Sequence, residues 1–229
     1  MLTLVIGNKN YSSWSMRPWV LLRQFGIQFE EIMLKFHSDE WAARIDLLSP
    51  SKLVPVCWQG PAGKPGSIAV WDTLAIMESV AEWFPDRAVW PRDGAARAMA
   101  RSMVAEMHAG FRPLRTMMPM NIRARHVGKG MDAEVAANIA RIESIWQEAR
   151  TRHGSAGDFL FGEFSAADAM FAPVVMRFNT YQPPLTEATR AYCARLTETA
   201  SVAEWIREAL REKEFVAEDE PYCPAPATP

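Results

Sequence analysis

The periodicity of the sequence changes near residue 85, and this change constrains the architecture more than any other feature. Up to residue 84, short runs of strand-like alternation take turns with runs of helical spacing. From residue 95 onward, the apolar residues follow helical spacing alone. Pro85, Pro91 and Gly94 bracket the polar segment between the two patterns, which is typical of a linker. We therefore expect two domains, 1–84 and 95–220, joined by a linker at 85–94.

The first domain is predicted to be an α/β domain with a mixed sheet. Its strand-like runs are residues 2–6, 28–34, 52–58 and 67–71, and its helical runs are 17–25, 41–48 and 72–83. The resulting order is β-α-β-α-β-β-α. Such an order places helices on the faces of a mixed sheet.

The second domain is predicted to be all-α. Helical spacing covers residues 95–118, 132–153, 165–178, 185–199 and 201–214. Ser165 and Asp168 stand three apart before an apolar run, which is the pattern of a capping box and indicates a structural role. The proline-rich end, residues 221–229, is predicted to be a disordered tail.

The composition indicates a globular cytoplasmic protein. Of the 229 residues, 49% are hydrophobic, and the net charge of −2 favours neither nucleic acid nor an acidic membrane as a partner. No apolar run approaches the length of a membrane span, and the N-terminus lacks the pattern of a signal peptide. Cys57, Cys193 and Cys223 lie far apart without a CxxC or Cys/His motif, so we expect no disulfide framework and no metal site.

Three serines stand where the first strand leads into the first helix. Ser12, Ser13 and Ser15 follow the strand 2–6 and precede the apolar helical run. Unpaired N–H groups and the positive end of the helix dipole favour an anion there, and a hydroxyl adds a donor. This combination suits a thiolate, whose pKa would fall. The alternative is that the serines only cap the helix.

Two further pairs of residues suggest contacts with a peptide-like ligand. A proline inside a strand-like run, as at Val54-Pro55, marks a sheet edge or a cis bond that leaves the backbone of Val54 free to pair with an extended ligand. Asp72 and Thr73 begin the next helix and would suit an amino-acid head group. The alternatives are an ordinary edge proline and an ordinary helix cap.

Together these motifs resemble the glutathione transferase superfamily over nearly the whole chain. The residues that carry the resemblance are Ser12 to Arg17, Pro50 to Pro55, Asp72-Thr73 and Phe161-Gly162 through Ser165–Asp168 to Pro173. The serine stretch is most similar to the zeta class, whose members read Ser-Ser-Cys-Ser-Trp-Arg. The resemblance implies a thioredoxin-like first domain, a helical second domain, glutathione as co-substrate, no metal, and a homodimer.

The resemblance also implies roles for individual residues. Ser12 is expected to hydrogen-bond the glutathione sulfur, with Ser13 and Ser15 supporting the turn and the thiolate. The glutathione-binding set is then Lys52, Val54, Pro55, Asp72 and Thr73, in which Val54 pairs with the cysteinyl backbone, Pro55 is cis, and Asp72 and Thr73 hold the γ-glutamyl end.

The chain departs from the zeta pattern in three places. Trp14 replaces the cysteine, Asp72 stands where Gln or Glu is usual, and Tyr181 aligns with a substrate-binding arginine while Arg177 lies out of register. Zeta-like isomerisation is therefore the runner-up. An omega-like enzyme would need a cysteine among residues 12–15, and a non-catalytic binding or scaffold protein of the same fold is the remaining alternative.

The second substrate is predicted to meet the helix that opens the second domain. On that helix His108, Phe111, Arg112 and Arg115 have the spacing of one face, and with Trp14 they would form an aromatic and cationic wall. The alternative is that these arginines make ordinary ion pairs. We predict an enzyme that joins the glutathione thiolate to a small apolar or aromatic electrophile.

Overall fold

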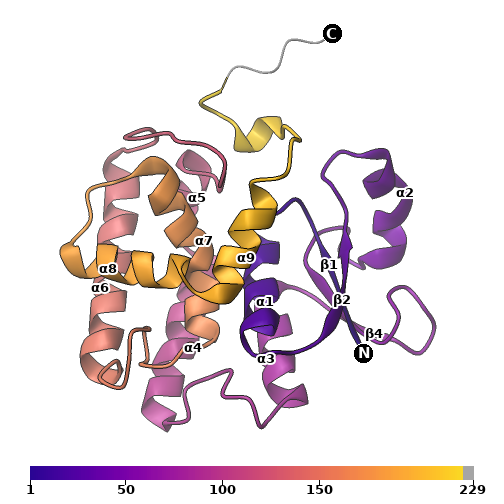
Figure 1. The fold of residues 1–229 in the computed structure, drawn as a ribbon, viewed down its shortest axis with the longest axis horizontal. Helices are drawn as coiled ribbons and strands as arrows, with labels where there is room; N and C mark the ends of the chain where they lie inside the picture. Colours follow the sequence, from indigo (N-terminus) through magenta and orange to yellow (C-terminus); the bar gives the residue numbers. More distant parts are fainter. Residues whose placement is uncertain (224–229) are drawn as a thin grey trace.

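The computed structural model describes residues 1–223, in which a small sheet domain stands beside a helical domain. Figure 1 shows the sheet and α2 on one side, α4 to α8 on the other, and α1 and α9 between them. The helices and strands are β1 (Leu2–Ile6), α1 (Ser13–Gln24), β2 (Phe29–Met33), α2 (Asp39–Leu48), β3 (Val56–Gln59), β4 (Ile68–Val70), α3 (Thr73–Trp83), α4 (Gly94–Ala109), α5 (Arg112–Met117), α6 (Ala133–His153), α7 (Ala166–Tyr181), α8 (Glu187–Thr197), α9 (Ala200–Ala209) and the 3₁₀ turn η1 (Ala217–Asp219).

The predicted mixed sheet is confirmed. Its strand order is β2-β1-β3-β4, with β1 parallel to β2 and antiparallel to β3, and β3 antiparallel to β4. Both faces of β1 are covered, because Leu4 and Ile6 join the large core that holds α1 while Val5 points to the smaller core under α2. β3 begins only at Val56, later than predicted, because Pro55 has no N–H to give to the ladder.

Helix α1 joins the two domains. It packs against α3 of its own domain and against α7 and α9 of the second domain. Its residues Met16 and Trp19 to Leu22 are fully buried. The helix begins at Ser13, earlier than the predicted residue 17, because Ser12 caps it. Contacts with both domains and the Ser12 cap therefore hold the start of α1 in place without a ligand.

Pro18 lies inside α1 and leaves one carbonyl without a helical partner. A proline has no N–H, so the carbonyl of Trp14, four residues earlier, loses its hydrogen bond within the helix. The Thr73 hydroxyl at the start of α3 donates to that oxygen at 2.9 Å. Thr73 thus joins the starts of α1 and α3.

Replacing Thr73 by valine should lower the free energy of unfolding by about 1–3 kcal/mol, because the Trp14 oxygen loses its donor while the shape of the side chain is kept. Urea unfolding measures the loss. Thr73→Ser is the matched control, since it keeps the hydroxyl and removes a methyl group. A valine variant as stable as wild type, with the serine variant weaker, would show that this hydrogen bond contributes nothing.

The single helix predicted at 95–118 is wrong. α4 ends at Ala109, Phe111 takes a left-handed conformation with φ of 56°, and α5 starts at Arg112. The cause is Pro113, which cannot donate to the carbonyl of Ala109 and clashes with it in a continuous helix. The chain therefore turns between His108 and Arg112, and these residues no longer share one helix face.

The remaining helices follow the prediction with shifted ends. Asp168 and Ser165 form the predicted capping box at the start of α7. The last helix ends at Ala209, not at residue 214, and the chain then returns to the first domain, where Glu212 accepts the N–H groups of Lys9 and Asn10. Of the predicted tail, residues 224–229 lie outside the described residues. Tyr222 is not free, because its hydroxyl donates to the Met117 carbonyl at 2.7 Å.

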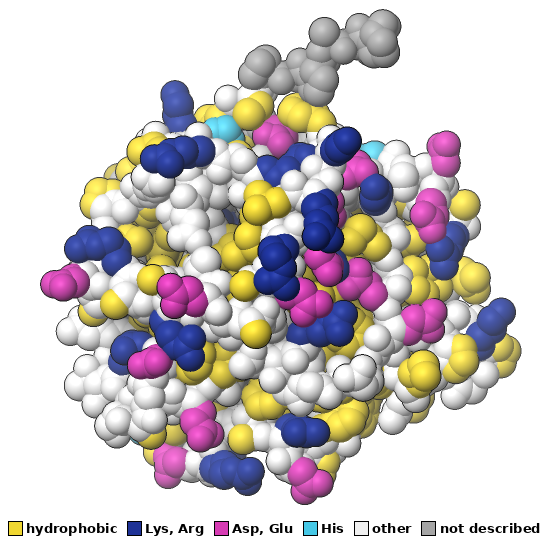
Figure 2. Space-filling model, viewed as in Figure 1, with side chains coloured by type: hydrophobic (Ala, Val, Ile, Leu, Met, Phe, Trp, Pro, Cys, Tyr) yellow, Lys and Arg dark blue, Asp and Glu magenta, His cyan; other side chains and the backbone are white. Residues whose placement is uncertain are grey.

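Ion pairs also join the domains. Arg23 on α1 pairs with Glu204 on α9, and Lys35 pairs with Glu214 after α9. Figure 2 shows acidic and basic side chains gathered over this part of the face it presents. Such exposed pairs contribute little each to stability. The association of the domains depends more on the apolar contacts of α1 and on the buried Lys9, which pairs with Glu208 on α9. Among residues 1–223, no helix combines the length and the apolar composition needed to cross a membrane.

Candidate functional site

A cleft of about 530 Å³ lies between the domains at the start of α1, a volume typical of small-molecule sites. Three segments of the first domain contribute to it, together with α5 and the residues just after it, the C-terminal part of α7, and the chain after α9. The lining residues are Tyr11, Ser12, Ser13, Trp14, Phe36, His37, Trp41, Leu53, Val54, Arg115, Pro119, Arg177, Val216, Glu218 and Asp219.

Two of the predicted serines form a chain of hydrogen bonds. Ser12 Oγ donates to Ser15 Oγ at 2.7 Å, and Ser12 Oγ accepts the N–H of Ser15 at 3.4 Å. Ser15 Oγ also accepts the N–H of Gly7 at 3.1 Å. Ser15 is fully buried and does not line the cleft, whereas Ser12 does. Both serines therefore hold the turn, and Ser12 alone of the two also faces the cleft.

Gly7 at the end of β1 packs closely against the Phe36 ring. A Cβ there would lie 2.5 Å from the Phe36 ring, and its N–H is the donor to Ser15. A larger residue would displace the Phe36 ring, which lines the cleft. Strand and helix are thus linked through Ser15, next to the cleft.

Ser13 faces the cleft beside Arg177. Nη2 of Arg177 lies 3.4 Å from Ser13 Oγ, in the position of a donor. The rest of the guanidinium is held by carbonyls, with Nε donating to Met118 and Nη1 to Pro173. Because the arginine donates to the Ser13 oxygen, the Ser13 hydroxyl proton is available for a ligand.

Buried charge of both signs meets at this end of the cleft. Burial lowers the pKa of Arg177 to about 10, with repulsion from Arg115 adding to the effect and attraction to Asp219 opposing it. At neutral pH the guanidinium is still charged. Burial also raises the pKa of Asp219 to about 6, against the attraction of Arg177. The cleft therefore becomes more positive as pH falls through the pKa of Asp219.

Trp14 lies among cations. The guanidinium of Arg17 is 4.3 Å from the ring centre and that of Arg115 is 5.2 Å away, while His108 meets the ring edge-on at 5.3 Å. Arg17 is fully buried, its Nε donates to the Met170 carbonyl, and neither Nη atom has a hydrogen-bond partner within residues 1–223. Burial and the neighbouring arginines lower the pKa of Arg17. The electron-rich face of Trp14 offsets part of this positive charge.

The predicted peptide-binding edge has the expected geometry at Val54. The Val54–Pro55 bond is cis, as predicted, and Val54 lines the cleft. Within residues 1–223, no backbone hydrogen bond involves Val54. Lys52 instead points to solvent and pairs with Asp46 at 3.0 Å, so its side chain does not line the cleft.

Asp72 and Thr73 adjoin the cleft without lining it. Thr73 is fully buried and its hydroxyl is bonded to Trp14, so it cannot also donate to a ligand. Asp72 caps α3 and its Oδ2 lies 3.1 Å from Nε2 of His108. The Thr73 hydroxyl therefore cannot donate the predicted hydrogen bond to the γ-glutamyl end of glutathione. Of the backbone N–H groups at the start of α3, that of Leu74 already donates to Asp72 Oδ1 at 3.2 Å, and that of Thr73 remains as a donor.

The predicted second-substrate wall is only partly assembled, because the helix is broken. Arg115 and Trp14 line the cleft. Phe111 is buried in the core, Arg112 is exposed, and His108 faces Trp14 and Asp72. These three do not line the cleft.

Several cleft residues were not predicted from the sequence, including Arg177, which was set aside as out of register. Arg177 is the most informative, because it is the one charged residue between Asp168 and the end of α7, a helix that is otherwise almost wholly buried. A lone arginine in such a helix is a usable signal. His37, Glu218 and Asp219 stand on loops and on a short turn, and nothing in their local sequence indicates a shared site.

The chain matches two family descriptions, in the order of its domains. Residues 11–83 match "Glutathione S-transferase, N-terminal domain", and residues 122–211 match "Glutathione S-transferase, C-terminal domain".

Individual proteins are similar across most of the chain. It is 25% identical to the maleylacetoacetate isomerase of Rattus norvegicus over 180 residues, covering 76% of this chain and 78% of that protein. A glutathione transferase homologue from Burkholderia gl BGR1 with bound glutathione is 21% identical, with a TM-score of 0.65 and coverage of 91% and 97%. Glutathione transferase Omega 2C from Trametes versicolor is 18% identical, with a TM-score of 0.67 and coverage of 89% and 92%. At these identities the two structures support the fold alone.

Proposed function

Because the chain belongs to the glutathione transferase superfamily, we propose that it binds glutathione in this cleft as the thiolate and joins it to an electrophilic carbon of a second substrate. The observation that carries the proposal is the position of two hydroxyls, Ser12 and Ser13, at the start of α1 and facing the cleft. Beside them, the unpaired backbone of Val54 can hold the cysteinyl unit as a strand would.

Ser12 is the hydroxyl that we assign to the sulfur. Its proton now points to Ser15 Oγ. Hydroxyls rotate, so when a thiolate enters, Ser15 can donate to Ser12 and free the Ser12 proton. Gly7 N–H, Ser15 and Ser12 then form a chain of donors that ends at the sulfur and polarises along its length. Ser13 is the rival, since Arg177 leaves its proton available.

The arginines at the second-domain wall suggest the class of electrophile. Arg115 and Arg177 face the cleft. Glu218 and Asp219 also line it and oppose an anion at neutral pH, and Asp219 lies near enough to Arg177 to attract its charge. Arg177 is held by carbonyls and by Ser13, without a salt bridge among the described residues. We propose an electrophile with one carboxylate near Arg177. The thiolate attacks its electron-poor carbon and either displaces a leaving group or leaves a carbanion that takes up a proton.

A matched pair of electrophiles tests this assignment. A substrate bearing a carboxylate should form its glutathione adduct about 10–100-fold faster than the corresponding primary amide, as the loss of a charged hydrogen bond requires. The preference should vanish in Arg177→Met and persist in Arg112→Met, the control at an exposed arginine. Adduct formation is followed by mass spectrometry. Equal rates for acid and amide in wild type would exclude the carboxylate site, and no adduct with any electrophile would exclude conjugation.

Isomerisation is a second candidate, favoured by the similarity to rat and mouse maleylacetoacetate isomerases. In an isomerisation by this chain, the thiolate would add to a double bond of the substrate, the new single bond would rotate, and elimination would restore the double bond and release glutathione unchanged. Glutathione consumption separates the two reactions, because conjugation uses one molecule for each product. We also retain the homodimer and the cytoplasmic location as proposals. A non-catalytic binding protein of this fold is the outcome if bound glutathione is not ionised.

A further inference from the structure

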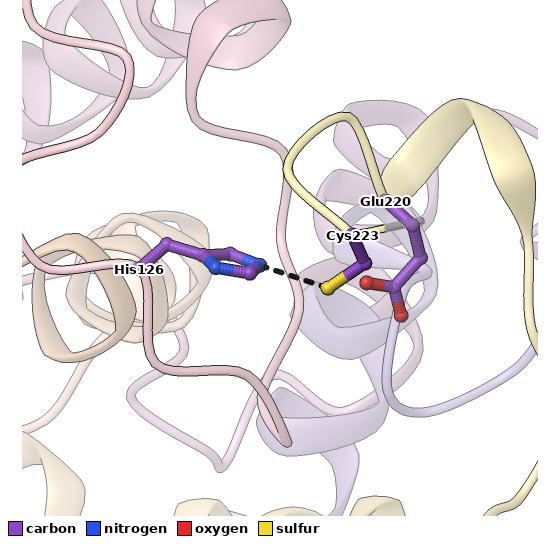
Figure 3. A group of neighbouring side chains, drawn as sticks. All are labelled: His126, Glu220 and Cys223. Atoms are coloured by element: carbon purple, nitrogen blue, oxygen red, sulfur yellow. Dashed lines mark hydrogen bonds between the residues drawn. The ribbon is translucent and has the colours of Figure 1, made fainter. Parts of the chain in front are cut away.

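A cluster of metal-binding side chains lies outside the cleft, at the join between the end of the chain and the loop before α6. Nε2 of His126, a carboxylate oxygen of Glu220 and Sγ of Cys223 all lie within 4.8 Å of one another. Figure 3 shows the imidazole pointing at the sulfur, with the carboxylate beside it. His126 and Cys223 are 97 residues apart in the sequence, so no short metal-binding motif predicts this cluster.

We propose that His126, Glu220 and Cys223 bind one Zn²⁺ ion, with water in a fourth position. Nitrogen, sulfur and oxygen ligands in a tetrahedron are the preference of zinc, and a thiolate disfavours Mg²⁺ and Ca²⁺. Zinc bonds of about 2.3 Å to sulfur and about 2.0–2.1 Å to nitrogen place these two atoms about 3.5 Å apart in a tetrahedron. They are 3.9 Å apart here, so a shift of a few tenths of an ångström brings this pair to the spacing of a zinc site. The Glu220 oxygen lies within 4.8 Å of both atoms and completes the set by a further side-chain movement.

The ligands are already oriented by their neighbours. The Tyr11 hydroxyl donates a hydrogen bond to the Glu220 carboxylate at 2.6 Å, and Arg123 donates to the oxygen of that hydroxyl. These two hydrogen bonds orient the carboxylate. The His126 ring stands between Tyr181 and Tyr222, with ring centres 5.7 and 5.5 Å away. A hydrogen-bonded partner such as Tyr11 orients a metal ligand and strengthens binding, and the two tyrosine rings restrict the position of the imidazole.

The backbone also brings two ligands together. Glu220 and Cys223 belong to one turn, closed by the Cys223 N–H donating to the Glu220 carbonyl at 3.1 Å. Cys223 is exposed, which gives an ion a path to the site and leaves room for the water. The other two cysteines, Cys57 and Cys193, are buried and lie elsewhere.

An ion here would fasten the end of the chain to the second domain. The turn follows η1 directly, and Glu218 and Asp219 of η1 line the cleft. Zinc would therefore hold one wall of the cleft in place. Because binding to the folded state adds to stability, the melting temperature should rise with zinc concentration.

The test uses the full chain, stripped of metal with a chelator and then dialysed. Titration with Zn²⁺ in the calorimeter should give one ion per chain. Cys223→Ser and His126→Asn should each weaken binding by more than about 100-fold, and Tyr11→Phe by about 10–100-fold, as for lost outer partners. His153→Asn is the control, because His153 stacks on Phe161 at a distant place.

The absorption spectrum with Co²⁺ and the melting temperature test the same site independently of the titration. Co²⁺ should produce a sulfur-to-cobalt charge-transfer band in wild type that Cys223→Ser abolishes. Zinc should raise the melting temperature of wild type and of His153→Asn but not of Cys223→Ser, an exposed substitution that leaves the fold intact. No saturable binding by wild type, or a cobalt band that survives in Cys223→Ser, overturns the site.

Discussion

Replacing Asp168 by alanine should lower the free energy of unfolding by about 3–5 kcal/mol, a loss typical of breaking a buried polar network. The carboxylate is fully buried and accepts hydrogen bonds from the Leu160 and Ser165 N–H groups and from the hydroxyls of Ser165 and Tyr192, at 2.9–3.2 Å. Alanine leaves all four donors without an acceptor at the start of α7. Because α7 packs against α1, the cleft should be lost with the domain interface.

The control for this loss is Asp158→Ala, which removes an exposed carboxylate paired with Arg195. Surface pairs of this kind contribute about 0–1 kcal/mol. Urea unfolding of both variants gives the comparison. If the two substitutions cost the same, the network at the start of α7 contributes no more to stability than a surface ion pair.

The pH dependence of this network has a definite sign. Burial raises the pKa of Asp168 to about 6, with the hydrogen bonds opposing the shift. The folded state therefore holds the proton more tightly than the unfolded state does. The stability that this adds is fully present below the unfolded pKa of about 3.9 and is lost as pH rises through about 6. Wild type should lose stability relative to Asp168→Asn over this range, and an unchanged difference would show that the carboxyl titrates normally.

Ser12→Ala should lower kcat/KM for conjugation by about 10²–10³-fold, the usual cost of removing one donor to a developing or resident anion. Glutathione affinity should change little, because the backbone contacts of Val54 and the start of α3 lie elsewhere. Activity should not vanish, since the helix dipole and N–H groups remain. Steady-state kinetics and calorimetry measure the two effects separately.

Ser15→Ala tests whether the donor chain behind Ser12 contributes to the ionisation of glutathione. Ser15 does not line the cleft, so a purely contact-based account predicts no electrostatic effect. The donor chain from Gly7 through Ser15 to Ser12 predicts that the pKa of bound glutathione rises in this variant as well. Ser102→Ala, at an exposed site on α4, is the control. If Ser13→Ala has the larger effect and Ser12→Ala is silent, Ser13 holds the sulfur.

Local chemistry predicted the parts of the fold that depend on neighbours in sequence. The capping box at Ser165 and Asp168 follows from a spacing of residue types that is specific to a helix start. The cis bond at Pro55 was expected from the family resemblance, because the proline alone also allowed an ordinary sheet edge. The break after His108 was missed although Pro113 carried the signal, because helical spacing of the apolar residues continues across it. Periodicity alone does not show where a proline removes a hydrogen bond.

Tertiary contacts decided the rest of the site. Thr73 was assigned to a ligand, whereas Pro18 had left the Trp14 carbonyl free to take its hydroxyl. Arg177 reaches the cleft only because α7 packs against α1, and His126 meets Cys223 only because the chain returns after α9. Pairings across such sequence distances depend on how the domains dock, which no local pattern records.

The pKa of bound glutathione decides whether this cleft holds it as the thiolate. The ultraviolet absorbance of the thiolate is followed against pH with wild type saturated by glutathione, and S-methylglutathione, which cannot ionise, provides the baseline. We predict a midpoint at least about one pH unit below the value of about 8.5 for a free thiol, or about 1.4 kcal/mol in favour of the anion, and a higher midpoint in Ser12→Ala. Bound glutathione that titrates at the same pH as free glutathione would contradict the account.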